Sequence, residues 1–246
     1  MKCLSHILGI ALTAGLMGFS QAPQTKPADP SNLQSVLHKM DEVAATFRSA
    51  QANFEWDTYE KVIDEVDEVQ TGTIYYRRTG KDIDMMAEVK KVGSNLVTVK
   101  PEPKYVLYSQ GKIRLYQPKA DQVTEFDVHK DHSDYESYVV LGFGGSGQDL
   151  QKVFDVTYEG PETINGVATA KLQLVPKSEA IRGTYKQIFL WIDLEKGVSV
   201  QQKFISPQDD YRLAKYSDIQ VNGKKIPDEV FKLKTTSKTQ TISPRG

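Results

Sequence analysis

The stretch 104–128, KYVLYSQGKIRLYQPKADQVTEFDV, constrains the fold more than any other part of the chain. It contains three short runs rich in β-branched and aromatic residues, at 105–109, 113–116 and 122–128. Gly111 lies between the first two runs and can supply the positive φ that a hairpin needs, and Pro118 interrupts the connection to the third. The pattern predicts an antiparallel meander, which belongs to an antiparallel sheet rather than to βαβ units.

Alternation with a period of two continues on both sides of this meander. Residues 53–59 and 73–77 alternate, and we expect the acidic stretch 64–70 to be the turn between them. Further strands are predicted at 81–92, 95–99, 155–158, 167–176, 185–193, 197–206 and 211–220. Ile188, Leu190, Ile192 and Leu194 share one face of a strand, whereas Phe189 and Trp191 share the other. Both faces are therefore covered, as in a curved sheet with helices on its inside.

Three stretches show helical spacing. Residues 33–47 place an apolar stripe on one side, and Asp29, Ser31 or Asn32 could cap their first turn. We interpret this stripe as packing on the sheet, with a partner-binding helix as the alternative. Residues 132–147 combine a short helix with a glycine-rich loop, and 148–154 predict a second short helix.

The N-terminus predicts export from the cytoplasm. Residues 1–20 have the basic start and short apolar run of a secretory signal peptide, and the polar, proline-containing stretch 21–30 predicts a disordered lead-in. Cys3 is the single cysteine and would be removed with that peptide. The processed chain would then have no thiol for a disulfide, a thiolate metal site or a nucleophile.

Charge and motifs exclude several function classes. The 31 basic and 32 acidic residues are spread along the chain, which argues against nucleic acid as a partner. His129 and His132 lie three apart without a third imidazole nearby, so we expect a solvated loop rather than a metal site. The glycines of 142–147 lack the Lys-Ser/Thr of a phosphate loop, and no catalytic triad emerges. We therefore expect no enzyme activity and no cofactor.

Several motifs resemble the LolA-like periplasmic lipoprotein carriers, in the correct order from Leu33 to Leu233. The matching letters are VLYSQGK at 106–112, LYQP at 115–118, QVT at 122–124, GTIYYRR at 72–78, LVPK at 174–177, QDDYRLAKY at 208–216 and PDEVFKL at 227–233. The resemblance implies a mainly β fold, an incomplete curved antiparallel β-barrel with helices covering its open side. It assigns residues 31–234 to this domain and 235–246 to a C-terminal tail.

The resemblance also implies a function. A monomeric carrier in the periplasm would bind the acyl chains of lipoproteins in an apolar cavity, receive them from an inner-membrane lipoprotein-releasing transporter, and deliver them to an outer-membrane receptor. Carriage or sensing of another envelope lipid or glycolipid remains an alternative, as does a non-catalytic binding module without lipid.

The family's functional arginine falls on Arg78 in this sequence. Ile74, Tyr76 and Arg78 share a strand face, where an arginine needs a carbonyl or hydroxyl partner and could hold a lid shut until a ligand displaces it. A solvated arginine at a strand end is the alternative. Thr79 stands where the family usually has proline, so a register slip to Arg77 stays open. With Arg78 as gate, the expected lipid-binding residues are Ile74, Tyr76, Leu107, Ile113, Leu115, Ile188, Leu190 and Ile192.

Overall fold

The computed structural model describes residues 32–80, 82–94, 100–127 and 141–243. The strands are β1 (Ser49–Glu60), β2 (Glu65–Thr79), β3 (Asp82–Gly93), β4 (Lys100–Ser109), β5 (Lys112–Gln117), β6 (Gln122–Asp127), β7 (Phe154–Ile164), β8 (Val167–Pro176), β9 (Gln187–Asp193), β10 (Ser199–Ile205), β11 (Tyr211–Val221) and β12 (Gln240–Ile242). The helices are α1 (Leu33–Thr46), α3 (Gly147–Val153) and α4 (Glu179–Arg182), with 3₁₀ turns η1 (Pro118–Ala120) and η3 (Asp228–Phe231).

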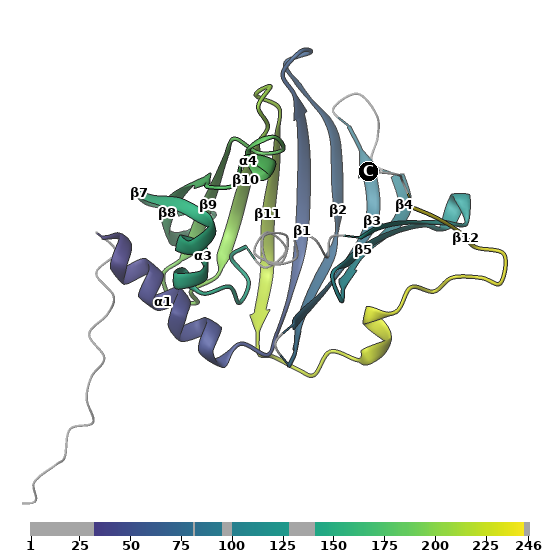
Figure 1. Ribbon diagram of the computed structural model, residues 1–246, viewed down its shortest axis with the longest axis horizontal. Coiled ribbons are helices and arrows are strands. Elements are labelled where there is room, and N and C mark those ends of the chain that lie inside the picture. The colour runs from purple at the N-terminus through teal and green to yellow at the C-terminus, as the bar shows by residue number, and fades with distance from the viewer. Residues whose placement is uncertain (1–31, 81, 95–99, 128–140, 244–246) are drawn as a thin grey trace, which may run out of the picture.

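These strands form one 12-stranded sheet in the order β12-β6-β5-β4-β3-β2-β1-β11-β10-β9-β8-β7. Its neighbours pair antiparallel except β12, which runs parallel to β6. The sheet curves strongly but its two edge strands, β12 and β7, do not meet (Figure 1). The expected fold class, an incomplete curved β-barrel with helices, is therefore confirmed.

Helix α1 begins where its sequence predicts. The side chain of Asn32 accepts a hydrogen bond from the Ser35 N–H at 2.8 Å, so Asn32 is the N-cap. Its buried residues Val36, Leu37 and Met40 pack in one cluster with strands β8 and β9. Burying each such side chain contributes about 1.5–3 kcal/mol, which accounts for the position of the helix against the sheet.

The meander also has the predicted form. Gln110 and Gly111 adopt φ values of 52° and 66° between β4 and β5, and Asn165 and Gly166 adopt 49° and 82° between β7 and β8. Two successive positive φ values match the right-handed twist of hairpin strands. The turn chemistry therefore fixes the strand register at both places.

Several boundaries differ from the expectation: β7 extends to Ile164 rather than ending at 158, and β4 begins at Lys100 rather than at 105. The turn between β1 and β2 is limited to 61–64, and the acidic stretch that follows belongs to β2 because Val66 and Val69 pair with β1. The expected tail contains β12, whose Gln240–Ile242 pairs with the first half of β6. The strand predicted at 95–99, most of the helix predicted within 132–147, the signal peptide and the lead-in lie outside the described residues.

The two faces of the sheet have different covers. We call the face that carries Ile74 and Leu190 the inner face, and the face that carries Met86 and Trp191 the outer face. Helices α1 and α3 lie over the β7–β10 part of the inner face (Figure 1). Residues 226–233 cross part of the outer face on the way from β11 to β12.

Candidate functional site

The inner face carries an apolar surface that continues over most of the sheet. One cluster joins α1 and α3 to β8 and β9, and a second joins residues 47–54 to β2 and β3. The strand register continues the second cluster along the inner face to β4 and β5. Ala87 on β3 pairs with Val106 on β4, which in turn pairs with Leu115 on β5. The inner face is therefore lined by aliphatic and aromatic side chains from β9 to β5.

Eight of the nine residues predicted from the sequence lie on this face, but in different surroundings. Ile188, Leu190 and Ile192 are fully buried beneath α1. Ile74 and Tyr76 are buried in the second cluster. Arg78, Ile113 and Leu115 are only partly buried, and Ile113 and Leu115 lie near the β6 edge. The β8–β9 half is therefore filled core, whereas the β4–β6 half keeps accessible apolar surface.

Leu107 is a correction to the predicted set. It pairs with Met86 and packs with Ile226 and Phe231, which lie on the outer face. The pairing of β3 with β4 determines which face each side chain occupies. Val106 pairs with Ala87 and Tyr108 pairs with Met85 on the inner face, so Leu107 lies on the outer face. Parity within one strand could not reveal how that strand aligns with its neighbour.

Residues 141–147, which we call the glycine segment, close over the centre of the inner face. The Ser199 N–H donates to the Gly142 carbonyl at 2.8 Å, which joins the segment to the start of β10. The side-chain amide of Gln202 donates to the Leu141 carbonyl and accepts a hydrogen bond from the Tyr216 hydroxyl at 3.1 Å. Buried polar groups of the sheet thus find their partners in the covering segment.

Phe143 is the side chain that this segment inserts into the sheet. It has no exposed surface, stacks on Tyr76 with ring centroids 4.9 Å apart, and meets Tyr216 edge-on at 4.9 Å. Burial, and then the neighbouring Tyr216, raise the pKa of Tyr76 well above its ordinary value. Both tyrosines therefore stay neutral and the aromatic cluster carries no charge.

Arg78 connects β2 to the same segment. Its Nη2 donates to the Gly144 carbonyl at 3.1 Å, and its guanidinium carbon lies 5.9 Å from the centre of the Phe47 ring. Its Nε is buried and has no hydrogen-bond partner among the described residues. One charged hydrogen bond thus links the arginine to the covering segment.

The glycines of this segment are required by close approach. A Cβ on Gly144, where φ is +82°, would lie 2.5 Å from the Phe47 ring. A Cβ on Gly142, where φ is +74°, would lie 2.2 Å from Cβ of Ser199. A side chain at either position would lift the segment from the sheet. The glycine-rich composition was visible in the sequence, but the role of Phe143 as an insert was not predicted.

Arg77 has a different role on the outer face. Its guanidinium pairs with Asp84 at 2.8 Å and Asp228 at 2.6 Å, and it lies 4.2 Å from the Phe231 ring centre. Arg77 thereby attaches η3 to the sheet. Of the two adjacent arginines, Arg78 contacts the cover of the inner face and Arg77 contacts the cover of the outer face.

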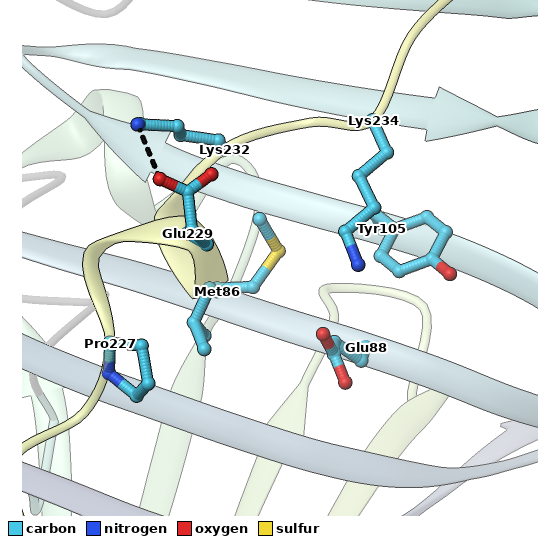
Figure 2. A pocket seen from close by; sticks show the side chains of 8 residues that line it. Met86, Glu88, Tyr105, Pro227, Glu229, Lys232 and Lys234 are labelled. Atoms are coloured by element: carbon cyan, nitrogen blue, oxygen red, sulfur yellow. Dashed lines mark hydrogen bonds and ion pairs between the residues drawn. The ribbon is translucent and has the colours of Figure 1, made fainter.

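A small cavity of about 220 Å³ lies beneath residues 227–234 on the outer face. Figure 2 shows Met86, Glu88 and Tyr105 on the strand side and Pro227, Glu229, Lys232 and Lys234 on the crossing segment. Lys232 pairs with Glu229 at 2.8 Å rather than with the sheet. The cavity is separated from the inner face by the sheet itself, so it forms no part of the apolar site.

Asp84 makes the attachment of η3 dependent on pH. Burial alone raises the pKa of this carboxyl, but hydrogen bonds from Ser109, Arg77 and Thr79 outweigh burial and hold the pKa below its ordinary value. Because the pKa of Asp84 is lower in the folded than in the unfolded chain, its ionised form stabilises the fold at pH values above the unfolded pKa of about 3.9. This stabilisation is lost as the pH falls through the folded pKa.

We therefore expect Asp84→Asn to cost about 1–2 kcal/mol of unfolding free energy at pH 7 and much less at pH 2. Urea denaturation of both proteins across this pH range measures the difference. Asp155→Asn, at an exposed carboxylate, serves as the control. An Asp84→Asn deficit that stays constant down to pH 2 would contradict the assignment.

Metal sites and membrane spans are two further classes of functional feature. The part of the chain that the structure describes contains no group of three or more His, Cys, Asp or Glu side chains placed to hold a metal ion. His129 and His132 lie outside that part. Nor does it contain a helix long and apolar enough to cross a membrane.

Several solved structures are similar to this architecture. An uncharacterized conserved protein from Thermus thermophilus superposes with a TM-score of 0.51 at 10% identity, covering 86% of this chain and 98% of that one. A LolA superfamily protein from Nitrosomonas europaea has a TM-score of 0.39 at 14% identity, with 81% and 97% covered. The first of these similarities shows that this chain shares the fold of the Thermus thermophilus protein.

LprF from Mycobacterium bovis is also similar, with a TM-score of 0.44 at 13% identity and coverage of 79% and 95%. At these identities, similarity to a solved structure concerns the fold alone. No family model matches the sequence, and no curated protein matches it.

Proposed function

We propose that this protein is a periplasmic carrier that binds the acyl chains of lipoproteins on its inner face and delivers them from the inner to the outer membrane. The observation that carries the proposal is the hydrogen bond from Arg78 to the Gly144 carbonyl, which links β2 to the glycine segment over an apolar, aromatic-lined surface and which we propose acts as a latch. The cover is also held by the Gly142 and Leu141 hydrogen bonds and by Phe143, but none of these contacts pairs one strand with another, so the cover can be released without unfolding the sheet.

The accessible part of the inner face provides the entry site. Ile113 and Leu115 are partly buried on β5, and the neighbouring Phe126 on β6 is 43% exposed. Each methylene buried on such a surface contributes about 0.8 kcal/mol to the binding free energy, so binding of an acyl chain there is strongly favourable. Displacing Phe143 would extend the site towards Ile74 and Tyr76, while Ile188, Leu190 and Ile192 would remain core.

Release follows from the same geometry. A receiver protein, such as an outer-membrane receptor, has to offer the acyl chains a better site, and the closing of the glycine segment assists transfer because it restores the Arg78 and Phe143 contacts. An inner-membrane transporter would supply the cargo. The proposal requires no catalytic group, no cofactor and no metal.

Binding of a fluorescent long-chain fatty acid to the purified, processed protein tests the latch. We expect Arg78→Met to weaken the closed form by about 1–2 kcal/mol and to tighten the apparent affinity about 5- to 30-fold, because less energy is spent on opening. We expect Leu115→Asp to weaken binding. Arg182→Met, which changes an exposed arginine on α4, is the matched control and should bind as the wild type does.

Native mass spectrometry of the protein isolated from envelopes identifies the cargo. Co-purified triacylated lipoprotein supports the carrier. A bound phospholipid or glycolipid would move the function to carriage or sensing of that lipid. An empty protein whose fatty-acid affinity is unaffected by Arg78→Met and Leu115→Asp would contradict the proposal.

A further inference from the structure

The hairpin of β1 and β2 ends in an apolar tip that projects beyond one end of the sheet (Figure 1). The Asp64 N–H donates to the Lys61 carbonyl at 3.3 Å, which places Val62 and Ile63 at the two central turn positions. These residues are 94% and 55% exposed, the highest values among the large hydrophobic side chains of the described chain. Turn centres favour Gly, Asn, Asp and Pro, so the fold itself gives no reason for two β-branched apolar residues here.

The tip is held rigidly. The Tyr59 hydroxyl donates to the Asp64 carboxylate, and the Tyr59 ring stacks on Tyr211 with centroids 4.5 Å apart. Asp210 accepts a hydrogen bond from the Lys61 N–H at 2.8 Å, which joins the tip to the turn before β11. The hydrogen bond to Asp64, followed by burial, raises the pKa of Tyr59 to about 12, so this hydroxyl stays neutral. A preformed tip loses little conformational freedom on binding.

The charge around the tip is negative on balance, although Lys61 lies in the turn and acts on Asp209. Glu60 and Glu65 are directly opposite each other in the strand pair, an arrangement of like charges that destabilises a ladder. Other carboxylates on the tip and its flanks are Asp64, Asp67, Asp209 and Asp210. Lys186 neutralises Asp209 at 2.5 Å, but Glu60 and Glu65 have no cationic partner in the described structure. A positively charged surface would relieve their repulsion.

We propose that this tip is the docking site for a partner protein that has an apolar pocket rimmed by lysine or arginine. Val62 and Ile63 would enter the pocket, and Glu60 and Glu65 would pair with the rim. An anionic lipid surface is the wrong partner, because it would repel the carboxylates that flank the apolar pair. The site lies outside the inner face and its function does not depend on what that face carries.

A photo-crosslinking amino acid at position 62 of the full chain, in cells of the native host, tests the docking. We expect an adduct to one protein, mapped by mass spectrometry to a segment with lysine or arginine beside apolar residues. We expect its yield to fall at least fivefold in Glu60→Lys/Glu65→Lys. This double change keeps like charges opposite each other in the strand pair while the sign of the charge is reversed, and its melting temperature is measured beside that of the wild type.

Two controls complete the test. A crosslinker at Ala120, another exposed connection, should not give the same adduct. Ile63→Ser should lower the yield from position 62 without changing the melting temperature. An adduct to phospholipid alone, an adduct indifferent to the charge reversal, or no adduct above the Ala120 control would overturn the proposal.

Vesicles of phosphatidylethanolamine and phosphatidylglycerol test the membrane alternative directly. We expect the purified protein to remain unbound when such vesicles are floated on a density gradient. Flotation of the wild type that is lost in Ile63→Ser would identify the tip as a membrane contact and overturn the assignment to a protein partner.

Discussion

Replacing Phe143 by alanine is expected to lower the free energy of unfolding by about 3–5 kcal/mol. The ring has no exposed surface and lies between Tyr76 and Tyr216, so its removal leaves a cavity lined by aromatic faces. Stacked and edge-on aromatic pairs each contribute about 0.5–1.5 kcal/mol beyond burial, and Phe143 makes one of each, so both are lost together. No other described side chain joins the glycine segment to both β2 and β11.

The same change should open the inner face. Without Phe143, the segment keeps the hydrogen bonds of Gly142 and Leu141 and the buried Leu141 side chain, but loses its aromatic anchor on β2 and β11. We expect the amides of this segment to exchange hydrogen at least tenfold faster, because a loss of about 1.4 kcal/mol in local stability already gives that factor.

Urea denaturation and hydrogen exchange measure the two effects. Phe126→Ala is the matched control, since it removes the same ring from a position that is 43% exposed and should cost about 0.5 kcal/mol. Equal costs for the two variants would show that Phe143 is not the anchor of the segment.

Much of this fold follows from local sequence signals. Alternation, turn glycines and the Asn32 cap predict the strands and α1, because each depends on neighbouring residues alone. The position of β12 could not be predicted in this way. Its three residues are stabilised by pairing with β6 and by Asp121, which accepts hydrogen bonds from Thr236 and Thr239, and these contacts span more than a hundred residues.

In the candidate site, too, features set by neighbouring residues could be predicted and features set by distant contacts could not. Strand parity placed Ile74, Tyr76 and Arg78 together because they lie on one strand, and it failed for Leu107 because parity between strands depends on register. The two adjacent arginines had to be distinguished by their partners, Gly144 for Arg78 and Asp228 for Arg77. Those partners come from distant segments, so sequence alone left the choice open.

Changing Gly72 to alanine is expected to destabilise the protein by about 3 kcal/mol, at the upper end for an added methyl group. A Cβ at this position would lie 1.9 Å from the backbone carbonyl oxygen of Glu88 on β3 and 2.8 Å from the Phe54 ring. The first contact is with backbone that belongs to the ladder, so the clash can be relieved only if β2 and β3 separate. The register shift between Thr71 and Gly72 brings the two strands this close.

This steric demand gives a physical reason for the glycine that begins the GTIYYRR motif, since Gly72 fixes the path of the strand that presents Ile74, Tyr76 and Arg78. We expect the urea midpoint of Gly72→Ala to fall, with faster hydrogen exchange in β2 and β3. Gly223→Ala is the control, because a Cβ there approaches no atom closer than 3.4 Å and restricts the unfolded chain. If Gly72→Ala were as stable as Gly223→Ala, the close approach of β2 and β3 would not exist in solution.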